Sequence, residues 1–162
     1  LTSSAASDVY KRQILDKSFF ISYRISKSEE ILRIIAWLFC FELSFYLSHR
    51  AMHKYRWIYN RVHKEHHLAV KTYPIDTYIL TPIEAVSITL NFLTGNLLGL
   101  KVTERSQMIV TFFLLFHNIL THGSPSYTKN MYFHNVHHKL QYCNFSINTP
   151  LMDILFGTYR GT

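Results

Sequence analysis

The stretch HRAMHKYRWIYNRVHKEHH, residues 49–67, carries five histidines in nineteen positions and directly follows a run of apolar residues. The other histidines are also grouped, so that none of the ten stands alone. The groups are His49 and His53; His63, His66 and His67; His117 and His122; and His134, His137 and His138. Imidazole is the commonest metal-binding side chain and titrates near neutral pH. Such grouping indicates a shared chemical site beside an apolar segment.

Three apolar stretches organise the chain, at residues 31–48, 82–100 and 106–122. The letters SEE at 28–30 predict a helix start with Ser28 as its N-cap and acids in the first turn, where the helix dipole favours them. The letters TPIE at 81–84 predict a second start, with Thr81 as the cap and Glu84 completing a capping box. A helix of about nineteen residues covers about 28 Å, close to the hydrocarbon thickness of a bilayer. The sequence therefore predicts an all-α, multi-pass membrane helical bundle whose last two helices form a hairpin.

A soluble helical bundle is the alternative, because Glu42, Asn91 and Asn96 interrupt the apolar runs. The runs are nevertheless apolar on all faces instead of along one stripe, which favours the membrane.

Basic residues follow the first apolar run and predict its orientation. Between positions 50 and 71 there is one acidic residue, Glu65, and there are six basic residues: Arg50, Lys54, Arg56, Arg61, Lys64 and Lys71. The positive-inside rule places this segment in the cytoplasm. The hairpin then goes out and back, so all four histidine groups meet as a cytoplasmic histidine-rich cap. Three spans leave residues 14–30 outside, which predicts that the chain lacks an upstream transmembrane helix.

Residues 8–13, DVYKRQ, resemble the translation of a transposon end used in sequencing libraries. We therefore expect residues 1–13 to be an adaptor-derived, non-native segment. Residues 14–162 are then expected to form a single membrane-embedded domain that is incomplete at its N-terminus.

The net charge of +7 could point to nucleic acid. The bases flank apolar segments, however, and do not form a stripe interleaved with aromatic residues, so no nucleic-acid partner is expected. Cys40 and Cys143 give neither a disulfide framework nor a CxxC metal motif.

The spacing of the histidines suits metal binding. Residues three and four apart on a helix share a face, so the HxxxH at 49–53 and the HxxHH boxes at 63–67 and 134–138 each aim their rings into one volume. Neutral imidazole is a good ligand for first-row metals, and eight such rings exceed the four that tetrahedral zinc needs. Two metal ions are therefore expected.

His117 and His122 are weaker candidates. Five residues correspond to about 500° around a regular helix, so both rings point inward only if the helix breaks near His122. The sequence Gly123-Ser124-Pro125 favours such a break. His122 is expected to be a ligand, whereas His117 is either a ligand, a residue that supports the ligands, or a packing residue.

Four polar residues near the histidines are candidates to support the site. Asparagines beside the boxes could orient rings by hydrogen bonds, although a turn role suits Asn144 equally. Glu42, two turns before His49, is an acid inside an apolar helix and either takes part in function or pairs locally. The candidates are Asn118, Asn135, Asn144 and Glu42.

The segments HRAMH, WIYNRVHKEHH, ILTHG and FHNVHHKLQYCNFSINTPLMDILFGTYR resemble the histidine boxes and closing segment of the fatty acid hydroxylase/sterol desaturase superfamily. The closing segment is similar to that of sterol C-5 desaturases. The resemblance covers roughly residues 31–160 and implies a non-haem di-iron membrane oxidoreductase. Carried over box by box, it implies these iron ligands: His49, His53, His63, His66, His67, His122, His134, His137 and His138.

The resemblance also implies a reaction and partners. Two irons, which zinc could replace, would use dioxygen and external electrons to hydroxylate or desaturate a sterol, fatty acyl or sphingoid chain. The donor would be a separate protein such as cytochrome b5 or a ferredoxin with its reductase. Such enzymes lie in the endoplasmic reticulum of eukaryotes or the inner membrane of bacteria. Thr81 stands where sterol-processing relatives often carry a histidine, which puts a sterol substrate in doubt.

Two other functional classes are compatible with histidine-rich membrane proteins. A zinc-dependent membrane hydrolase would need a carboxylate base beside the metal, and no HExxH occurs. A metal transporter or metal-binding protein would place its ligands at the bilayer midplane instead of past the helix ends.

Overall fold

The computed structural model describes residues 25–123 and 133–161, and all regular structure within these two ranges is helical. The all-α prediction is therefore confirmed for this part of the chain. The expected adaptor segment, residues 1–13, and the Ser124-Pro125 part of the expected helix break lie outside the described residues.

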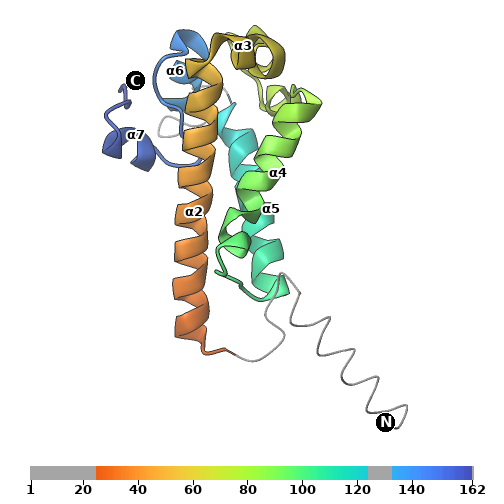
Figure 1. Cartoon of the computed structure of the whole chain (residues 1–162), viewed down its shortest axis with the longest axis vertical. Coiled ribbons are helices and arrows are strands. Elements are labelled where there is room, and N and C mark those ends of the chain that lie inside the picture. Colours follow the sequence, from red (N-terminus) through yellow and green to blue (C-terminus); the bar gives the residue numbers. More distant parts are fainter. Residues whose placement is uncertain (1–24, 124–132, 162) are drawn as a thin grey trace, which may run out of the picture.

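The longest helix is α2, Lys27–Lys54, which runs the length of the molecule in Figure 1. The hydroxyl of Ser26 caps it by accepting from the backbone of Glu29, so the cap lies two residues before the predicted Ser28. Arg33 pairs with Glu29 one turn away at 2.9 Å. The helix ends where Tyr55 takes an extended conformation. The first apolar run and the HxxxH box thus form one continuous helix.

The next helices run in opposite directions beside α2. Helix α4, Pro82–Leu97, is capped by Thr81 as predicted and ends before Gly99, whose positive φ of 81° suits glycine. Helix α5, Glu104–Thr121, returns to the starting end and is capped by Thr103 (Figure 1). The expected up-and-down pair is therefore present, although α4 has only 16 residues.

Short helical pieces connect α2 to α4 at one end of the molecule. These are α3, Arg56–Ile58; η1, a π-helix over Tyr59–His63; η2, a 3-10 helix over His66–Leu68; and η3, a 3-10 helix over Pro74–Tyr78. In the π-helix the backbone N–H of Lys64 donates to the carbonyl of Tyr59 at 2.8 Å. Such widened turns occur most often at functional sites. The second histidine box is consequently not part of a regular α-helix, contrary to the prediction.

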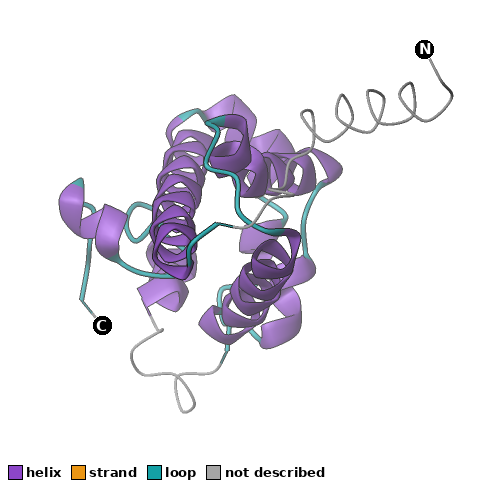
Figure 2. Cartoon of the chain, turned by 90° about the horizontal axis from the view of Figure 1, so that it is seen from below, coloured by secondary structure: helices purple, strands orange, loops and turns teal. Residues whose placement is uncertain are grey.

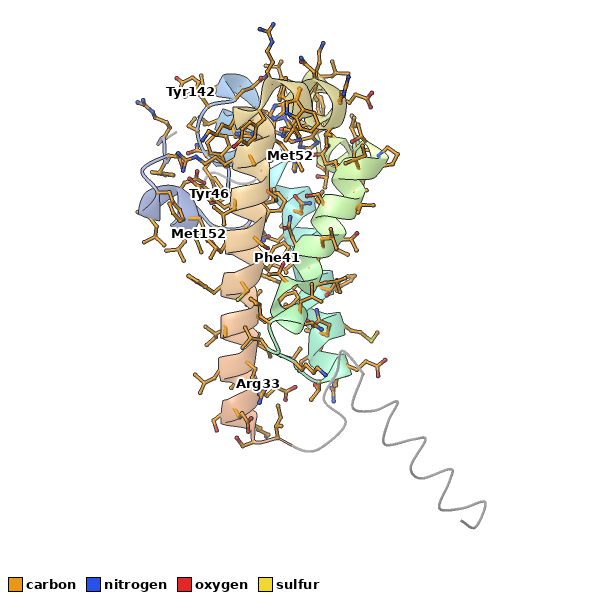
Figure 3. All side chains as sticks on the ribbon, viewed as in Figure 1. Arg33, Phe41, Tyr46, Met52, Tyr142 and Met152 are labelled. Atoms are coloured by element: carbon orange, nitrogen blue, oxygen red, sulfur yellow. The ribbon has the colours of Figure 1, made fainter. Side chains whose placement is uncertain are left out.

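Two helices complete the C-terminal part. Helix α6, Phe133–Leu140, carries the third box, and α7, Leu151–Leu155, lies against α2. Figure 3 shows Tyr46 of α2 and Met152 of α7 on this side of the molecule. With Phe145 they form a small buried apolar cluster.

The main core joins α2 to its neighbours below the histidines. It consists of Trp37, Phe41, Leu114 and Ile147, and Phe41 lies 4.6 Å from Phe92 between ring centroids. The indole of Trp37 lies so close to Gly95 of α4 that a β-carbon there would collide with it. At the lower end, Ser106 donates to Glu30 at 2.6 Å and ties α5 to α2. This packing fixes the three long helices as one scaffold, seen end-on in Figure 2.

Among the described residues, one helix is long and apolar enough to cross a membrane, and it is α2. The expectation of several spans, with the histidines on the cytoplasmic side, therefore stays a prediction.

Candidate metal centre

Nine of the ten histidines come together at the end of the bundle where α2 stops. The last turns of α2 supply His49 and His53, and His122 is the first residue after α5. The short pieces after α3 supply His63, His66 and His67, and α6 supplies His134, His137 and His138. The expected convergence of histidines from distant parts of the sequence is therefore present in the structure.

The nine rings form two groups, in each of which one ligand nitrogen per residue lies within 4.8 Å of all the others. Group one consists of His49, His53, His63, His67 and His137. Group two consists of His66, His122, His134 and His138. The groups adjoin, because the ring centroids of His67 and His138 are 4.7 Å apart.

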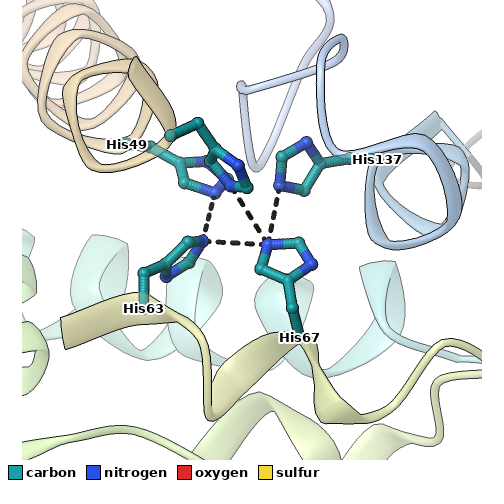
Figure 4. A group of neighbouring side chains, drawn as sticks. His49, His63, His67 and His137 are labelled. Carbon is teal, nitrogen blue, oxygen red and sulfur yellow. Dashed lines mark hydrogen bonds between the residues drawn. The ribbon is translucent and has the colours of Figure 1, made fainter. Parts of the chain in front are cut away.

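In group one the Nε2 atoms face one another (Figure 4). The Nε2 atom of His67 lies 3.0 Å from that of His63, 3.1 Å from that of His53 and 3.2 Å from that of His137. The Nε2 atoms of His49 and His63 are 2.9 Å apart. In group two the Nε2 atoms of His66 and His122 are 3.4 Å apart.

The two HxxHH boxes are each divided between the groups. His63 and His67, four residues apart, belong to group one, while His66 belongs to group two. His134 and His138, again four apart, belong to group two, while His137 belongs to group one. Each box therefore serves both groups, instead of aiming all its rings into one volume as predicted.

Backbone carbonyls fix the protonation state of several rings. His49 Nδ1 donates to the carbonyl of Phe145 at 2.6 Å, and His137 Nδ1 donates to that of Cys143 at 2.7 Å. In group two His122 Nδ1 donates to the carbonyl of Asn118 at 3.0 Å. A carbonyl oxygen can only accept, so the single hydrogen of each neutral ring sits on Nδ1. The Nε2 atoms of these rings therefore carry bare lone pairs.

His66 Nδ1 likewise donates to the carbonyl of Ile79 at 3.2 Å, so the Nε2 atoms of His66 and His122, 3.4 Å apart, face each other with bare lone pairs that a cation between them would satisfy. With a metal–nitrogen bond of about 2.1 Å, two ligand nitrogens lie about 3.0 Å apart at a right angle and about 3.4 Å apart at the tetrahedral angle. The contacts from 2.9 to 3.4 Å match that range. Both histidine groups thus fit metal ions, with imidazole as the ligand type.

Burial keeps the rings in the neutral form that ligands require. Burial first, and then the neighbouring imidazoles, lower the pKa of His66 and His137 well below the usual value. The same burial, with His49 nearby, lowers the pKa of His67 to about 3. A buried imidazolium loses its hydration, so the charged form is disfavoured.

The sequence pattern missed the role of Glu84. Its Oε1 atom lies 2.6 Å from Nδ1 of His63, and both side chains are buried. The carboxyl group of Glu84 therefore holds His63 from the side opposite group one, an arrangement that orients metal-binding histidines. Glu84 was expected only to complete a capping box with Thr81. The sequence did contain a signal for this role: Glu84 is an acid in the first turn of a helix that begins beside the histidines.

None of the three asparagines expected to support the site is seen to bond a histidine ring through its side chain; the contacts involve backbone groups. Asn118 supports His122 through its carbonyl, not its side chain. Asn135 donates to the carbonyl of Gly123 at 2.8 Å and accepts from Thr72. Asn144 donates to the carbonyl of Phe133, the first residue of α6, at 2.9 Å.

Two further candidates lie outside both groups. Glu42 is buried against Asn148 in the middle of α2. His117 lies on α5 beside Phe113, at 5.9 Å between ring centroids. Because α5 ends at Thr121, His122 turns into group two while His117 remains on the helix. His117 therefore lies outside both groups of candidate ligands.

The sequence of residues 34–158 matches the family described as fatty acid hydroxylase. This match covers most of the chain. The chain belongs to the fatty acid hydroxylase family. The family resemblance of the histidine boxes is thereby confirmed.

Several curated proteins are similar to this fatty acid hydroxylase family member. Protein CER1-like 1 of Arabidopsis thaliana is 29% identical over 137 residues, with 72% of this chain and 21% of that protein covered. Very-long-chain aldehyde decarbonylase GL1-6 of Oryza sativa subsp. indica is 27% identical over 135 residues, with 72% of this chain and 21% of that protein covered. Sphinganine C4-monooxygenase 2 of Arabidopsis thaliana is 26% identical over 129 residues, with 70% of this chain and 49% of that protein covered. The chain thus spans half or less of the length of these relatives. No solved structure matches it.

The grouping predicts which histidines control metal content. His137→Ala and His138→Ala each remove one ring from a different group, so each variant should hold less metal than the parent chain. His117→Ala, which leaves both groups intact, is the matched control and should keep the parent's content. The measurement is metal per chain by mass spectrometry after purification in mild detergent. Equal losses in all three variants would contradict the grouping.

Proposed function

We propose that this chain is a membrane oxidoreductase that hydroxylates or desaturates a lipid at a non-haem di-iron centre. The observation that carries the proposal is the pair of adjoining histidine groups with unprotonated nitrogens turned inward. Family membership supports it, because some relatives are named as a monooxygenase and as aldehyde decarbonylases acting on long-chain compounds.

The reaction class follows from the chemistry of a lipid chain. An unactivated C–H bond offers no acidic proton and no leaving group, so acid–base groups alone cannot attack it. Two irons held by the histidine groups would supply the reductive activation of dioxygen that such a bond requires. Within the chain, the backbone carbonyls and Glu84 hold the rings in a fixed orientation, and burial keeps the rings neutral. Burial of the rings excludes bulk water from the reacting centre.

A small cavity of about 30 Å³ lies beside the histidines, where the reacting carbons of a substrate would approach the metals. It is bounded by rings of both groups, including His63 and His122, and it extends between α2 and α4. Its apolar lining includes Phe45 and Ile88, whereas Phe41 and Phe92 are packed in the core. Its polar lining consists of Ser48, Thr77, Glu84, Ser87, Asn91 and Asn118.

The surface of the bundle supports a membrane location. Large apolar side chains are exposed along α2, as in Leu32 and Ile35, and along α5, as in Phe112 and Phe113. Monomeric soluble proteins rarely expose apolar surface of this extent. A bilayer around the three long helices would cover it, and the histidine end would then face the cytoplasm. The compartment would be the endoplasmic reticulum in a eukaryote or the inner membrane in a bacterium.

An external electron donor is required, and the histidine end suits an acidic one. Arg50 and Lys54 are exposed at the end of α2 and line a groove that also reaches His53 of group one. Arg56, Arg61 and Lys64 are exposed nearby. A basic surface steers an acidic partner such as cytochrome b5 or a ferredoxin. The groove would bring its redox group close to the metal ligands.

The membrane arrangement can be tested by cysteine labelling. Lys71→Cys lies at the histidine end and Glu104→Cys at the start of α5, so a bilayer around the bundle should leave them on opposite sides. An impermeant thiol reagent applied to intact cells or sealed vesicles should label only one, after Cys40 and Cys143 are changed to serine. Labelling of both from the same side would refute the proposed spans.

The reaction is tested with dioxygen, a reductase system and a pool of membrane lipids. The full chain should produce a hydroxylated or unsaturated lipid, detected by mass spectrometry. His63→Ala and His134→Ala each remove one ring and should abolish the product while membrane insertion persists. His117→Ala is the matched control. Equal turnover without dioxygen would refute the oxygenase proposal and point to a hydrolase.

A further inference from the structure

The carbonyls that fix three of the histidines come from a single short segment. The carbonyl of Cys143 accepts from His137, that of Phe145 from His49 and that of Ser146 from His134, the last at 3.3 Å. We call residues 143–146 the carbonyl segment. Since His49 and His137 belong to group one and His134 to group two, the segment supports both groups at once.

The carbonyl segment is not part of a helix, so its peptide groups must be held in another way. Asp153 of α7, which is completely buried, supplies the bonds. Its Oδ1 atom accepts from the backbone N–H of Phe145 and its Oδ2 atom from that of Ser146, both at 2.8 Å. Oδ1 also accepts from the hydroxyl of Thr158 at 2.7 Å. A carboxylate can take all three because it is a pure acceptor.

Asn144 anchors the same segment from within. Its side chain donates to the carbonyl of Phe133 at the start of α6 and accepts from the backbone N–H of Arg160 at 2.7 Å. Its backbone N–H donates to the carbonyl of Thr158 at 3.0 Å. A positive φ of 56° turns the chain at this residue, a conformation that asparagine tolerates.

We propose that Asp153 is a positioning residue of the metal centre, acting through the carbonyl segment on His49, His137 and His134. The inference rests on the proposed function, since it gives α7 and the closing segment a role in holding the same metals. Asp153 touches no imidazole. It fixes the peptide groups whose carbonyls set the direction and tautomer of rings in both groups.

The substitution Asp153→Asn isolates this role because it barely changes the size of the side chain. An amide has one acceptor oxygen, so it can serve Phe145 and Thr158 or Ser146, but not all three. The remaining peptide N–H meets an NH₂ group and loses its partner. The carbonyl segment should therefore shift. Loss of such outer support typically lowers metal affinity about 10- to 100-fold.

The test measures zinc affinity of the full chain in mild detergent, by competition with a graded chelator and metal analysis. Asp153→Asn should bind zinc about 10- to 100-fold more weakly than the parent chain. Thr158→Val removes one hydrogen bond to the Asp153 carboxylate but leaves the two hydrogen bonds from the backbone N–H groups of Phe145 and Ser146. This variant should keep the parent's zinc affinity. Trp37→Phe removes a buried bond to Asn96 about three turns from His49, and it controls for general loss of stability. Melting temperatures are recorded for all variants.

A second variant covers the case in which Asp153→Asn does not fold. Asn144→Gly keeps the turn, because glycine accepts a positive φ, but it removes the side-chain anchors to Phe133 and Arg160. Its zinc affinity should also fall. Parent-like affinity in whichever of the two variants is folded, beside a parent chain that binds two zinc ions, would overturn this inference alone. A parent chain that binds no zinc would overturn the proposed function with it.

Discussion

The structure depends on one electrostatic constraint: imidazole nitrogens without hydrogens are turned toward one another inside the protein. His66 and His122 face each other across 3.4 Å, and each carries its hydrogen on the opposite side of the ring, toward the carbonyl of Ile79 or Asn118. Facing lone pairs repel, and burial makes protonation costly. A metal cation resolves both difficulties at once. Metal binding and folding of this end of the bundle should therefore be coupled.

The rest of the fold serves to bring these rings together. α2 carries the first box past the end of the apolar core, and the up-and-down pair of α4 and α5 returns the chain to the same end. α4 also delivers Glu84, while α7 holds the segment behind α6 through Asp153. Each of these helices carries a ring, or a group that orients one, at or next to its end, so the bundle acts as a frame for the site.

Much of this was predictable from sequence because it depends on local patterns. The histidine boxes, the all-helical class and the cap at Thr81 follow from spacing and capping chemistry. The π-turn before His63 and the division of each HxxHH box between two groups depend on how segments meet, which spacing alone does not encode. The local pattern predicts only a capping-box role for Glu84, because its histidine partner lies 21 positions earlier in the chain. Asp153 gave no signal, since it contacts backbone groups and not a histidine.

The central claim is that nine histidines hold two metal ions in two distinct groups. Anomalous diffraction at the iron absorption edge, from crystals of the iron-loaded chain, tests it most directly. The account predicts two iron peaks, one surrounded by His49, His53, His63, His67 and His137 and the other by His66, His122, His134 and His138. A single peak, or iron bound away from these rings, would contradict it.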